Sequence, residues 1–145
     1  MSLRTLSLCA LVLALVATSP APAAARGKPA GLRLTADAVS PGPGDATASG
    51  TFKVSVGRDE LSFSCAVANV AGLIQSIAIY RGAPGTNGSL VVRCSPSVIG
   101  IYGLNGIVPV TSTLGREIAR NPERFYMEIR TTAYPSGALR GSLKQ

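Results

Sequence analysis

The side chains that could carry out chemistry in this chain are few, and none of them is a histidine. The sequence has 145 residues, with 7 acidic residues, 3 cysteines and no histidine. A serine or cysteine nucleophile would therefore lack an imidazole base. A glycosidase needs two carboxylates flanking a cleft, and nothing in the sequence brings Glu117 toward Glu128. We predict no catalytic residue, no metal site and no cofactor.

The most chemically mixed surface arises where predicted strands place aromatic and charged side chains on one face. Strand parity groups Tyr80, Tyr126, Glu128, Arg130 and Arg140 in this way. If the strands that carry Tyr80 and Arg130 are neighbours, Arg130 can stack on Tyr80 and pair with Glu128. Together with Arg81, these residues form a candidate binding patch for an anion or a glycan. The alternative interpretation is a solvated group of ion pairs on an outer sheet.

A second candidate for chemistry is modification at Asn87. Asn87, Gly88 and Ser89 match the acceptor pattern for N-glycosylation, in a glycine-rich loop that we expect at the surface. The dipeptide Asn-Gly is also the preferred pair for a type I′ turn, in which both residues need a positive φ. The two interpretations are compatible, and glycosylation depends on a eukaryotic host.

The N-terminal residues have the pattern of a signal peptide. Arg4 supplies a positive charge, residues 6–16 are apolar apart from Ser7, and residues 17–25 are mostly small. The apolar run is shorter than the roughly 20 residues that span a bilayer, although a membrane anchor is the alternative. We expect cleavage after Ala25, with Ala23 as the second choice. The mature protein is therefore predicted to be secreted and to have no membrane span.

Export determines how the cysteines and the charge are interpreted. Cys9 leaves with the signal peptide, so Cys65 and Cys94 remain, and an even pair in an oxidising environment predicts a disulfide. Closing a loop of about 30 residues would stabilise the fold by about 3.5 kcal/mol. The mature chain keeps 13 Lys and Arg against 7 Asp and Glu, a net charge of +6. This balance favours contact with anionic polysaccharide or phospholipid over nucleic acid, because no basic run or recognition motif is present. Arginines spaced singly along strands also commonly form no more than a solvated face.

The elements that would position these residues are short strands separated by turns. Residues 26–31 form a predicted flexible linker before a domain that covers 32–145. We predict strands at 32–39, 51–56, 61–67, 74–80, 90–94, 125–131 and 138–143. The one helix predicted covers 112–120, capped by Ser112 or Thr113 and ended by Asn121 and Pro122. Residues 95–111 give no assignment.

Alternation along these strands predicts which residues face the core. Apolar side chains fall on one face at Phe52, Val54 and Val56, at Leu61, Phe63, Cys65 and Val67, at Ile77 and Ile79, and at Leu90, Val92 and Cys94. Both cysteines have core parity, as a buried bridge between strands requires. We predict an all-β fold, an antiparallel Greek-key-like sandwich of about seven strands with one short helix before the penultimate strand.

Three blocks of the sequence, in order, resemble the CHRD (chordin-type) domain family. Residues 34–39 (LTADAV) with 48–51 (ASGT) resemble its opening, and residues 81–88 (RGAPGTNG) resemble its central glycine loop. Residues 126–143 resemble its closing segment, above all Thr131, Tyr134-Pro135, Gly137 and residues 139–141. The resemblance implies an extracellular β-sandwich module, as in chordin, which binds growth factors.

The chain departs from the family at positions that could hold a metal. Ala78 and Tyr80 stand where members commonly carry a His-x-His pair, and Arg130 stands at a closing-strand histidine. Ala138 replaces a frequent acidic residue. Alanine has no lone pair to offer and a guanidinium is no acceptor, so a metal function is not carried over.

These observations predict a secreted, non-catalytic module that binds an extracellular protein or an anionic glycan, or that serves as a structural wall or matrix component. One alternative is a carbohydrate-active hydrolase of unrecognised type that uses the carboxylates. Another is a degenerate relative of a metal-binding ancestor that is kept for its fold.

Overall fold

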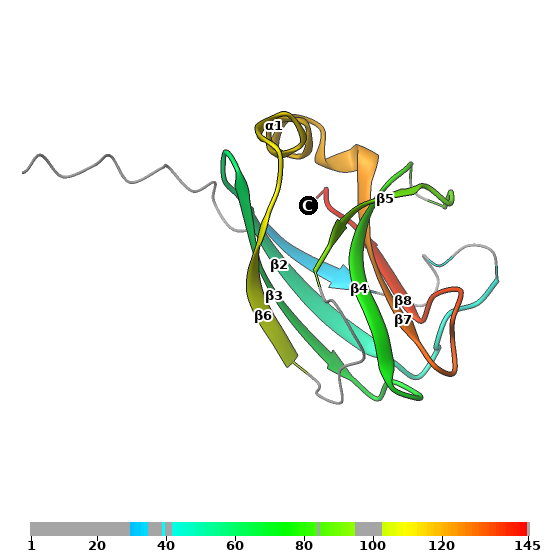
Figure 1. Cartoon of the computed structure of the whole chain (residues 1–145). Coiled ribbons are helices and arrows are strands. Elements are labelled where there is room, and N and C mark those ends of the chain that lie inside the picture. The colour runs from blue at the N-terminus through cyan, green and yellow to red at the C-terminus, as the bar shows by residue number, and fades with distance from the viewer. Residues whose placement is uncertain (1–29, 35–38, 40–41, 84, 95–102, 145) are drawn as a thin grey trace, which may run out of the picture.

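Two antiparallel sheets of four strands each pack face to face in the computed structural model of the chain (Figure 1). The structure describes residues 30–34, 39, 42–83, 85–94 and 103–144. The first sheet has the order β1-β2-β3-β6, formed by β1 (Ala30–Leu34), β2 (Ser49–Val56), β3 (Glu60–Ala68) and β6 (Gly103–Pro109). The second has the order β5-β4-β7-β8, formed by β5 (Ser89–Arg93), β4 (Ile74–Arg81), β7 (Phe125–Thr131) and β8 (Leu139–Ser142). The predicted all-β sandwich is confirmed.

The element bounds differ from the prediction mainly at the start of the domain and in the segment without an assignment. Strand β1 begins at Ala30, inside the predicted linker, and ends at Leu34. Strand β6 lies within the segment for which the sequence predicted no element, so the described residues form eight strands and not about seven. The signal peptide, both cleavage sites and residues 95–102 lie outside the described residues. In the part that is described, no helix is long and apolar enough to cross a membrane.

The alternation of apolar residues builds the core between the sheets. A tight turn at residues 57–59 joins β2 to β3, and the Gly57 amide donates to the Glu60 carbonyl at 2.8 Å. The first sheet buries Phe52, Val54, Leu61, Phe63, Cys65 and Val67, and the second buries Ile77, Ile79, Phe125, Met127, Ile129 and Leu139. Burial of these side chains is the main favourable contribution to folding. The period of two residues therefore predicted the inward faces of β2, β3 and β4 correctly.

A β-bulge corrects the predicted face of β5. Ile79 pairs with Val92, but the next residue, Tyr80, pairs with Leu90, so the register shifts between them. An extra residue in one strand reverses the parity on either side of it. Val92 and Cys94 are buried, whereas Leu90 is 43% exposed, so the prediction that Leu90 shares their face is wrong.

The predicted helix is confirmed as α1 (Ser112–Arg120), which lies across one end of the sandwich (Figure 1). The side chain of Thr111, and not Ser112 or Thr113, caps it by accepting a hydrogen bond from the Leu114 amide at 3.2 Å. Asn121 ends the helix, and η1 (Pro122–Arg124) follows it directly. Gly115 packs so closely on the β2–β3 turn that a Cβ there would lie 2.8 Å from the Gly57 carbonyl oxygen.

The end of the sandwich opposite α1 is tied together by one buried carboxylate. Asp45 is 1% exposed, and its oxygens accept hydrogen bonds from the Ala71 amide at 2.7 Å and the Thr47 hydroxyl at 2.7 Å. Burial raises the pKa of Asp45, but the hydrogen bonds from Ala71 and Thr47 outweigh it, so the pKa is lowered overall. Asp45 therefore holds together two loops that lie far apart in the sequence.

Candidate functional site

The outer face of the second sheet carries five of the residues that strand parity grouped. We name Tyr80, Tyr126, Glu128, Arg130 and Arg140 the outer-face cluster. Strand pairing places Tyr80 beside Tyr126 and Glu128 beside Arg140. The two tyrosine rings stack at a centroid distance of 5.4 Å and an interplanar angle of 8°. The structure thus brings together residues from three strands that the sequence separates by up to about 60 positions.

Glu128 is the centre of the outer-face cluster. Its side chain is fully buried, and one carboxylate oxygen accepts a hydrogen bond from Arg130 Nε at 2.7 Å. The other oxygen accepts a hydrogen bond from Arg140 Nε at 2.8 Å and a second one from Arg140 Nη2. Arg140 is itself 2% exposed, so the ion pair is buried on both sides. The interpretation of this face as a solvated group of ion pairs is therefore wrong for Glu128 and Arg140, and holds only for Arg130, whose side chain is 38% exposed.

Both arginines of the cluster also lie over tyrosine rings. The guanidinium carbon of Arg130 is 5.2 Å from the centroid of Tyr80, and that of Arg140 is 4.2 Å from the centroid of Tyr126. The contacts predicted for Arg130, stacking on Tyr80 and pairing with Glu128, are both present. A cation–π contact stabilises a protein by about 0.5–1 kcal/mol where the cation is exposed, as at Arg130, and by up to about 2 kcal/mol where it is desolvated, as at Arg140.

The pKa values in the cluster follow from burial and from its charges. Burial raises the pKa of Tyr80, and the charge of Arg130 opposes this without reversing it. Burial alone would lower the pKa of Arg130, but the hydrogen bond and the charge of Glu128 raise it overall. The cluster therefore holds a neutral phenol between fixed charges.

The loop between β4 and β5 closes over the cluster. Arg140 donates through Nη1 to the Thr86 carbonyl at 3.0 Å and through Nη2 to Asn87 Oδ1 at 2.9 Å. The Gly88 amide donates to the Tyr126 hydroxyl at 2.9 Å. These bonds explain why a charged outer sheet face is buried.

Close packing, and not turn geometry, explains the Asn87–Gly88 pair. Neither residue has a positive φ, so the predicted type I′ turn is wrong. A Cβ at Gly88 would lie 1.6 Å from the Arg81 carbonyl oxygen, so only glycine fits there. Asn87 itself is exposed, as the glycosylation pattern requires.

Arg81, which the sequence grouped with this patch, lies elsewhere. It pairs with Phe125 in the sheet, and its guanidinium lies over the Phe125 ring at 5.6 Å. Arg81 Nη2 also forms an ion pair with a Glu117 carboxylate oxygen of α1 at 2.6 Å. The alternation of strand faces separates Arg81 from Tyr80, so Arg81 is not part of the outer-face cluster.

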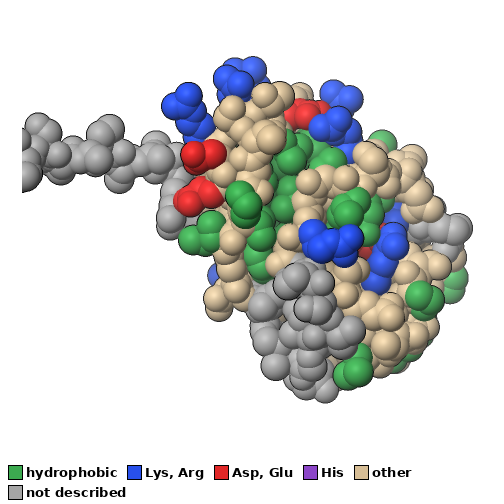
Figure 2. All heavy atoms as spheres, viewed as in Figure 1, with side chains coloured by type: hydrophobic (Ala, Val, Ile, Leu, Met, Phe, Trp, Pro, Cys, Tyr) green, Lys and Arg blue, Asp and Glu red, His purple; other side chains and the backbone are tan. Residues whose placement is uncertain are grey.

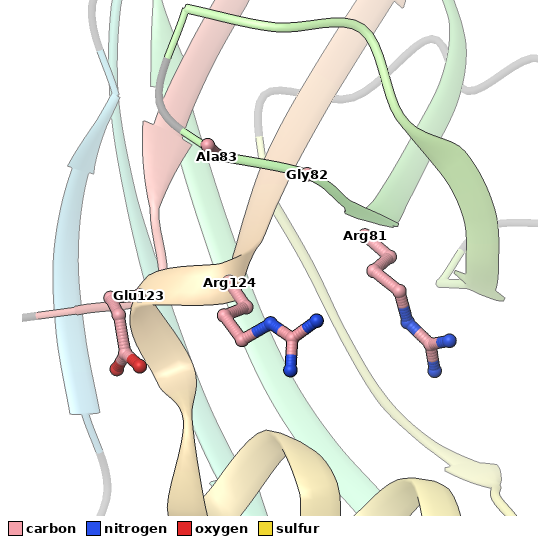
Figure 3. A pocket seen from close by; sticks show the side chains of 5 residues that line it. All are labelled: Arg81, Gly82, Ala83, Glu123 and Arg124. Atoms are coloured by element: carbon pink, nitrogen blue, oxygen red, sulfur yellow. The ribbon is translucent and has the colours of Figure 1, made fainter.

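Arg81 instead borders a surface hollow of about 440 Å³ beside η1. We name this site the arginine hollow, and its lining residues are Arg81, Gly82, Ala83, Glu123 and Arg124 (Figure 3). A hydrogen bond of 2.8 Å from the Gly82 amide to the Arg124 carbonyl holds its two walls together. In Figure 3 the Arg81 and Arg124 side chains extend in the same direction, and Glu123 lies on the far side of Arg124 from Arg81. Arg124 and Glu123 were not predicted from the sequence as part of a site, because only the pairing of Arg81 with Phe125 brings them beside residues 81–83.

Comparison with known proteins now identifies the fold. The family model for the CHRD domain matches residues 31–143, which is nearly the whole sandwich. This chain belongs to the CHRD domain family. No curated protein and no solved structure matches it. The resemblance found in the three sequence blocks is therefore confirmed.

This CHRD domain brings together the positions at which the resemblance led us to expect histidines. Ala78 and Tyr80 lie in one buried group with Tyr126, and Arg130 covers the Tyr80 ring. Ala78 pairs across the sheet with Glu128. In place of imidazoles, the site holds a methyl group, a phenol and a guanidinium that already binds a carboxylate. No group of three or more potential metal ligands occurs among the residues that the structure describes.

The two cysteines of this CHRD domain lie in the same core cluster, between the sheets. Both Cys65 and Cys94 are buried free thiols in the structure, so the predicted disulfide is not formed in it. Burial raises the pKa of each thiol to about 12, and the charge of Cys65 contributes to the shift at Cys94. The disulfide between them remains a prediction.

Proposed function

We propose that this CHRD domain is a secreted, non-catalytic module that binds an extracellular protein or an acidic glycan, or that packs as a structural component. Membership of the family supports an extracellular-type module. The mature chain carries the excess of basic residues that favours anionic surfaces.

The proposal depends mainly on Glu128, whose two carboxylate oxygens both already accept hydrogen bonds from arginines. A general acid or base must reach a substrate through an accessible cleft. Glu128 is fully buried and accepts hydrogen bonds from two arginines, one of which also binds the covering loop. The charged groups of the outer-face cluster thus stabilise the fold. We therefore expect ligands to contact arginines at the surface.

The geometry offers no support for a hydrolase that uses Glu117 and Glu128. Glu117 pairs with Arg81 beside α1, whereas Glu128 pairs with Arg130 and Arg140 under the β4–β5 loop. The two carboxylates are therefore bound to different arginines in separate sites. Elemental analysis of the purified protein tests the metal-binding alternative. Stoichiometric zinc or copper would contradict our proposal.

Secretion predicts a covalent bond between two side chains of the core. We propose that an oxidant of the export route removes two electrons and two protons from the Cys65 and Cys94 thiols and leaves them joined in a disulfide, which is supported by their burial in one core cluster. Peptide mapping without reduction should recover the two cysteine peptides linked. Free thiols at both positions in protein collected from the medium would contradict the proposed disulfide.

Asn87 is the proposed site of glycan attachment in a eukaryotic host. Its side-chain oxygen binds Arg140, and that bond does not use the amide nitrogen to which a glycan is attached. The residue is exposed at the rim of the covering loop. Loss of a mass increment on treatment with a glycosidase that removes N-glycans, absent in Asn87→Gln, would establish the modification.

Binding itself is tested with the purified mature protein. A glycan array and a pull-down from extracellular extract should each be read at high protein concentration, with a heat-denatured sample as control. Specific retention of an extracellular protein or an acidic glycan supports the proposal. Blank results from both experiments would contradict the binding function.

A further inference from the structure

The arginine hollow carries both positively and negatively charged side chains at the surface. Among the described residues, neither Arg124 nor Glu123 forms a side-chain hydrogen bond or ion pair, and both are exposed. Arg81 is bound to Glu117, but that pair uses one terminal nitrogen of its guanidinium. The hollow therefore offers the unused donors of Arg81 and the whole guanidinium fork of Arg124. It also offers the Glu123 carboxylate, which can only accept.

Acidic sugars match this combination of donors and acceptors. A sulfate or carboxylate group accepts paired N–H donors from a guanidinium, and sugar hydroxyls donate to a carboxylate. An anion without hydroxyl groups would use the arginines but would be repelled by Glu123. A neutral sugar would leave the Arg124 fork without an ionic partner.

The shape of the arginine hollow fits one unit of a chain better than a deeply enclosed ligand. Its volume is about 440 Å³, and the wall formed by Gly82 and Ala83 bears no side chain larger than a methyl group. The hydrogen bond from Gly82 to the Arg124 carbonyl fixes the distance between this wall and η1 before any ligand binds. Around the end of the molecule that carries α1, Figure 2 shows further Lys and Arg side chains at the surface. A polysaccharide that leaves the hollow can therefore meet additional cations.

We infer that the arginine hollow is a subsite for one acidic sugar unit of an extracellular polysaccharide, an inference that rests on the proposed binding function. The acidic group binds Arg124 together with Arg81, and ring hydroxyls donate to Glu123. Arg81 is held in position by Glu117 and by the Phe125 ring.

The test measures the affinity of the folded mature protein for three hexasaccharides of equal length: a heparin fragment, a polygalacturonate fragment and neutral maltohexaose. The first two distinguish a sulfated from a carboxylated source. We expect binding of at least one acidic chain, with affinity that falls as salt is added, and no binding of maltohexaose. Arg124→Gln should weaken binding by at least about tenfold, because it removes a charge-assisted hydrogen bond. Lys53→Gln removes one positive charge from the exposed face of β2, in the other sheet, and should change affinity by less than about twofold.

Glu123→Ala separates a built subsite from general electrostatic attraction. If the ligand merely follows net charge, removing this carboxylate strengthens the binding of an acidic chain. If the hollow binds a hydroxylated unit, the same change weakens binding by about two- to threefold.

The outcomes also separate this inference from the proposed function. Equal losses for Arg124→Gln and Lys53→Gln, a gain for Glu123→Ala, or retention of maltohexaose alone would overturn the subsite and leave the binding function standing. No binding of any glycan or extracellular protein would overturn both.

Discussion

The outer-face cluster and the arginine hollow begin at adjacent residues of β4, Tyr80 and Arg81, and they use arginine in opposite ways. In the cluster, Arg140 is 2% exposed and bonded to Glu128, Thr86 and Asn87. In the hollow, Arg124 is exposed and has no side-chain partner among the described residues. The difference teaches that burial and the number of partners, not residue type, decide whether an arginine stabilises the fold or remains available to a ligand.

The largest test of this comparison removes the carboxylate at the centre of the cluster. Glu128→Gln should destabilise the protein by about 3–5 kcal/mol, because Arg140 is left as a buried and uncompensated charge. The matched change at the surface, Glu117→Gln, breaks the partly exposed pair with Arg81 and should cost about 0–1 kcal/mol. Urea unfolding followed by circular dichroism gives both values.

A double variant keeps this prediction falsifiable if Glu128→Gln does not fold. Glu128→Leu with Arg140→Leu replaces both partners by apolar side chains and should recover much of the loss. Equal destabilisation by the Glu128 and Glu117 variants would show that the two ion pairs do not differ as burial requires.

The covering loop can be released by adding one methyl group. Gly88→Ala places a Cβ where the Arg81 carbonyl oxygen lies, so the loop must shift and the bond to the Tyr126 hydroxyl is strained. We expect a loss of about 2–3 kcal/mol. Gly85→Ala is the control in the same loop, since its Cβ meets nothing within 4 Å and only its positive φ is strained, at about 1 kcal/mol. Loss of the difference between the two variants would argue against close packing of the loop.

The buried phenol of the cluster predicts a loss of stability in alkali. The pKa of Tyr80 is raised in the folded protein, so folding favours the protonated phenol. Its contribution is complete below the ordinary value of 10.0 and is lost as the pH rises through the folded pKa. Tyr80→Phe should reduce the alkaline decline in the free energy of unfolding, whereas Tyr134→Phe, outside the cluster, should not. An unchanged slope in Tyr80→Phe would contradict the pKa shift.

The smallest effect on stability is expected at Arg124, which the comparison describes as available to a ligand. Arg124→Gln should change the free energy of unfolding by less than about 0.5 kcal/mol, because its exposed guanidinium holds no partner in the described part of the fold. The same urea experiment measures it, with Arg140→Gln as the buried counterpart. A large loss in Arg124→Gln would place this arginine among the stabilising ones.

Local periodicity made much of this fold predictable from the sequence. Alternation at Phe52 and Val54 and at Leu61 through Val67 predicted the inward face of the first sheet, since a strand turns successive side chains to opposite sides. The helix at residues 112–120 was predicted with the observed bounds, because Asn121 and Pro122 mark its end locally, although its cap is Thr111 and not Ser112 or Thr113. The CHRD resemblance likewise depended on blocks that can be compared without coordinates.

The environment of each charge was decided only by the tertiary structure. Parity correctly grouped Tyr80, Glu128, Arg130 and Arg140, but it could not show that the β4–β5 loop closes over Glu128. Arg81 had been added to this patch against parity, and the structure pairs it with Glu117 instead. The register shift between β4 and β5 placed Leu90 opposite Tyr80, and the pairing of Arg81 with Phe125 placed Arg124 beside the hollow. Burial and partnership are properties of contacts between residues far apart in the chain, and such contacts leave no periodic trace in the sequence around any one of them.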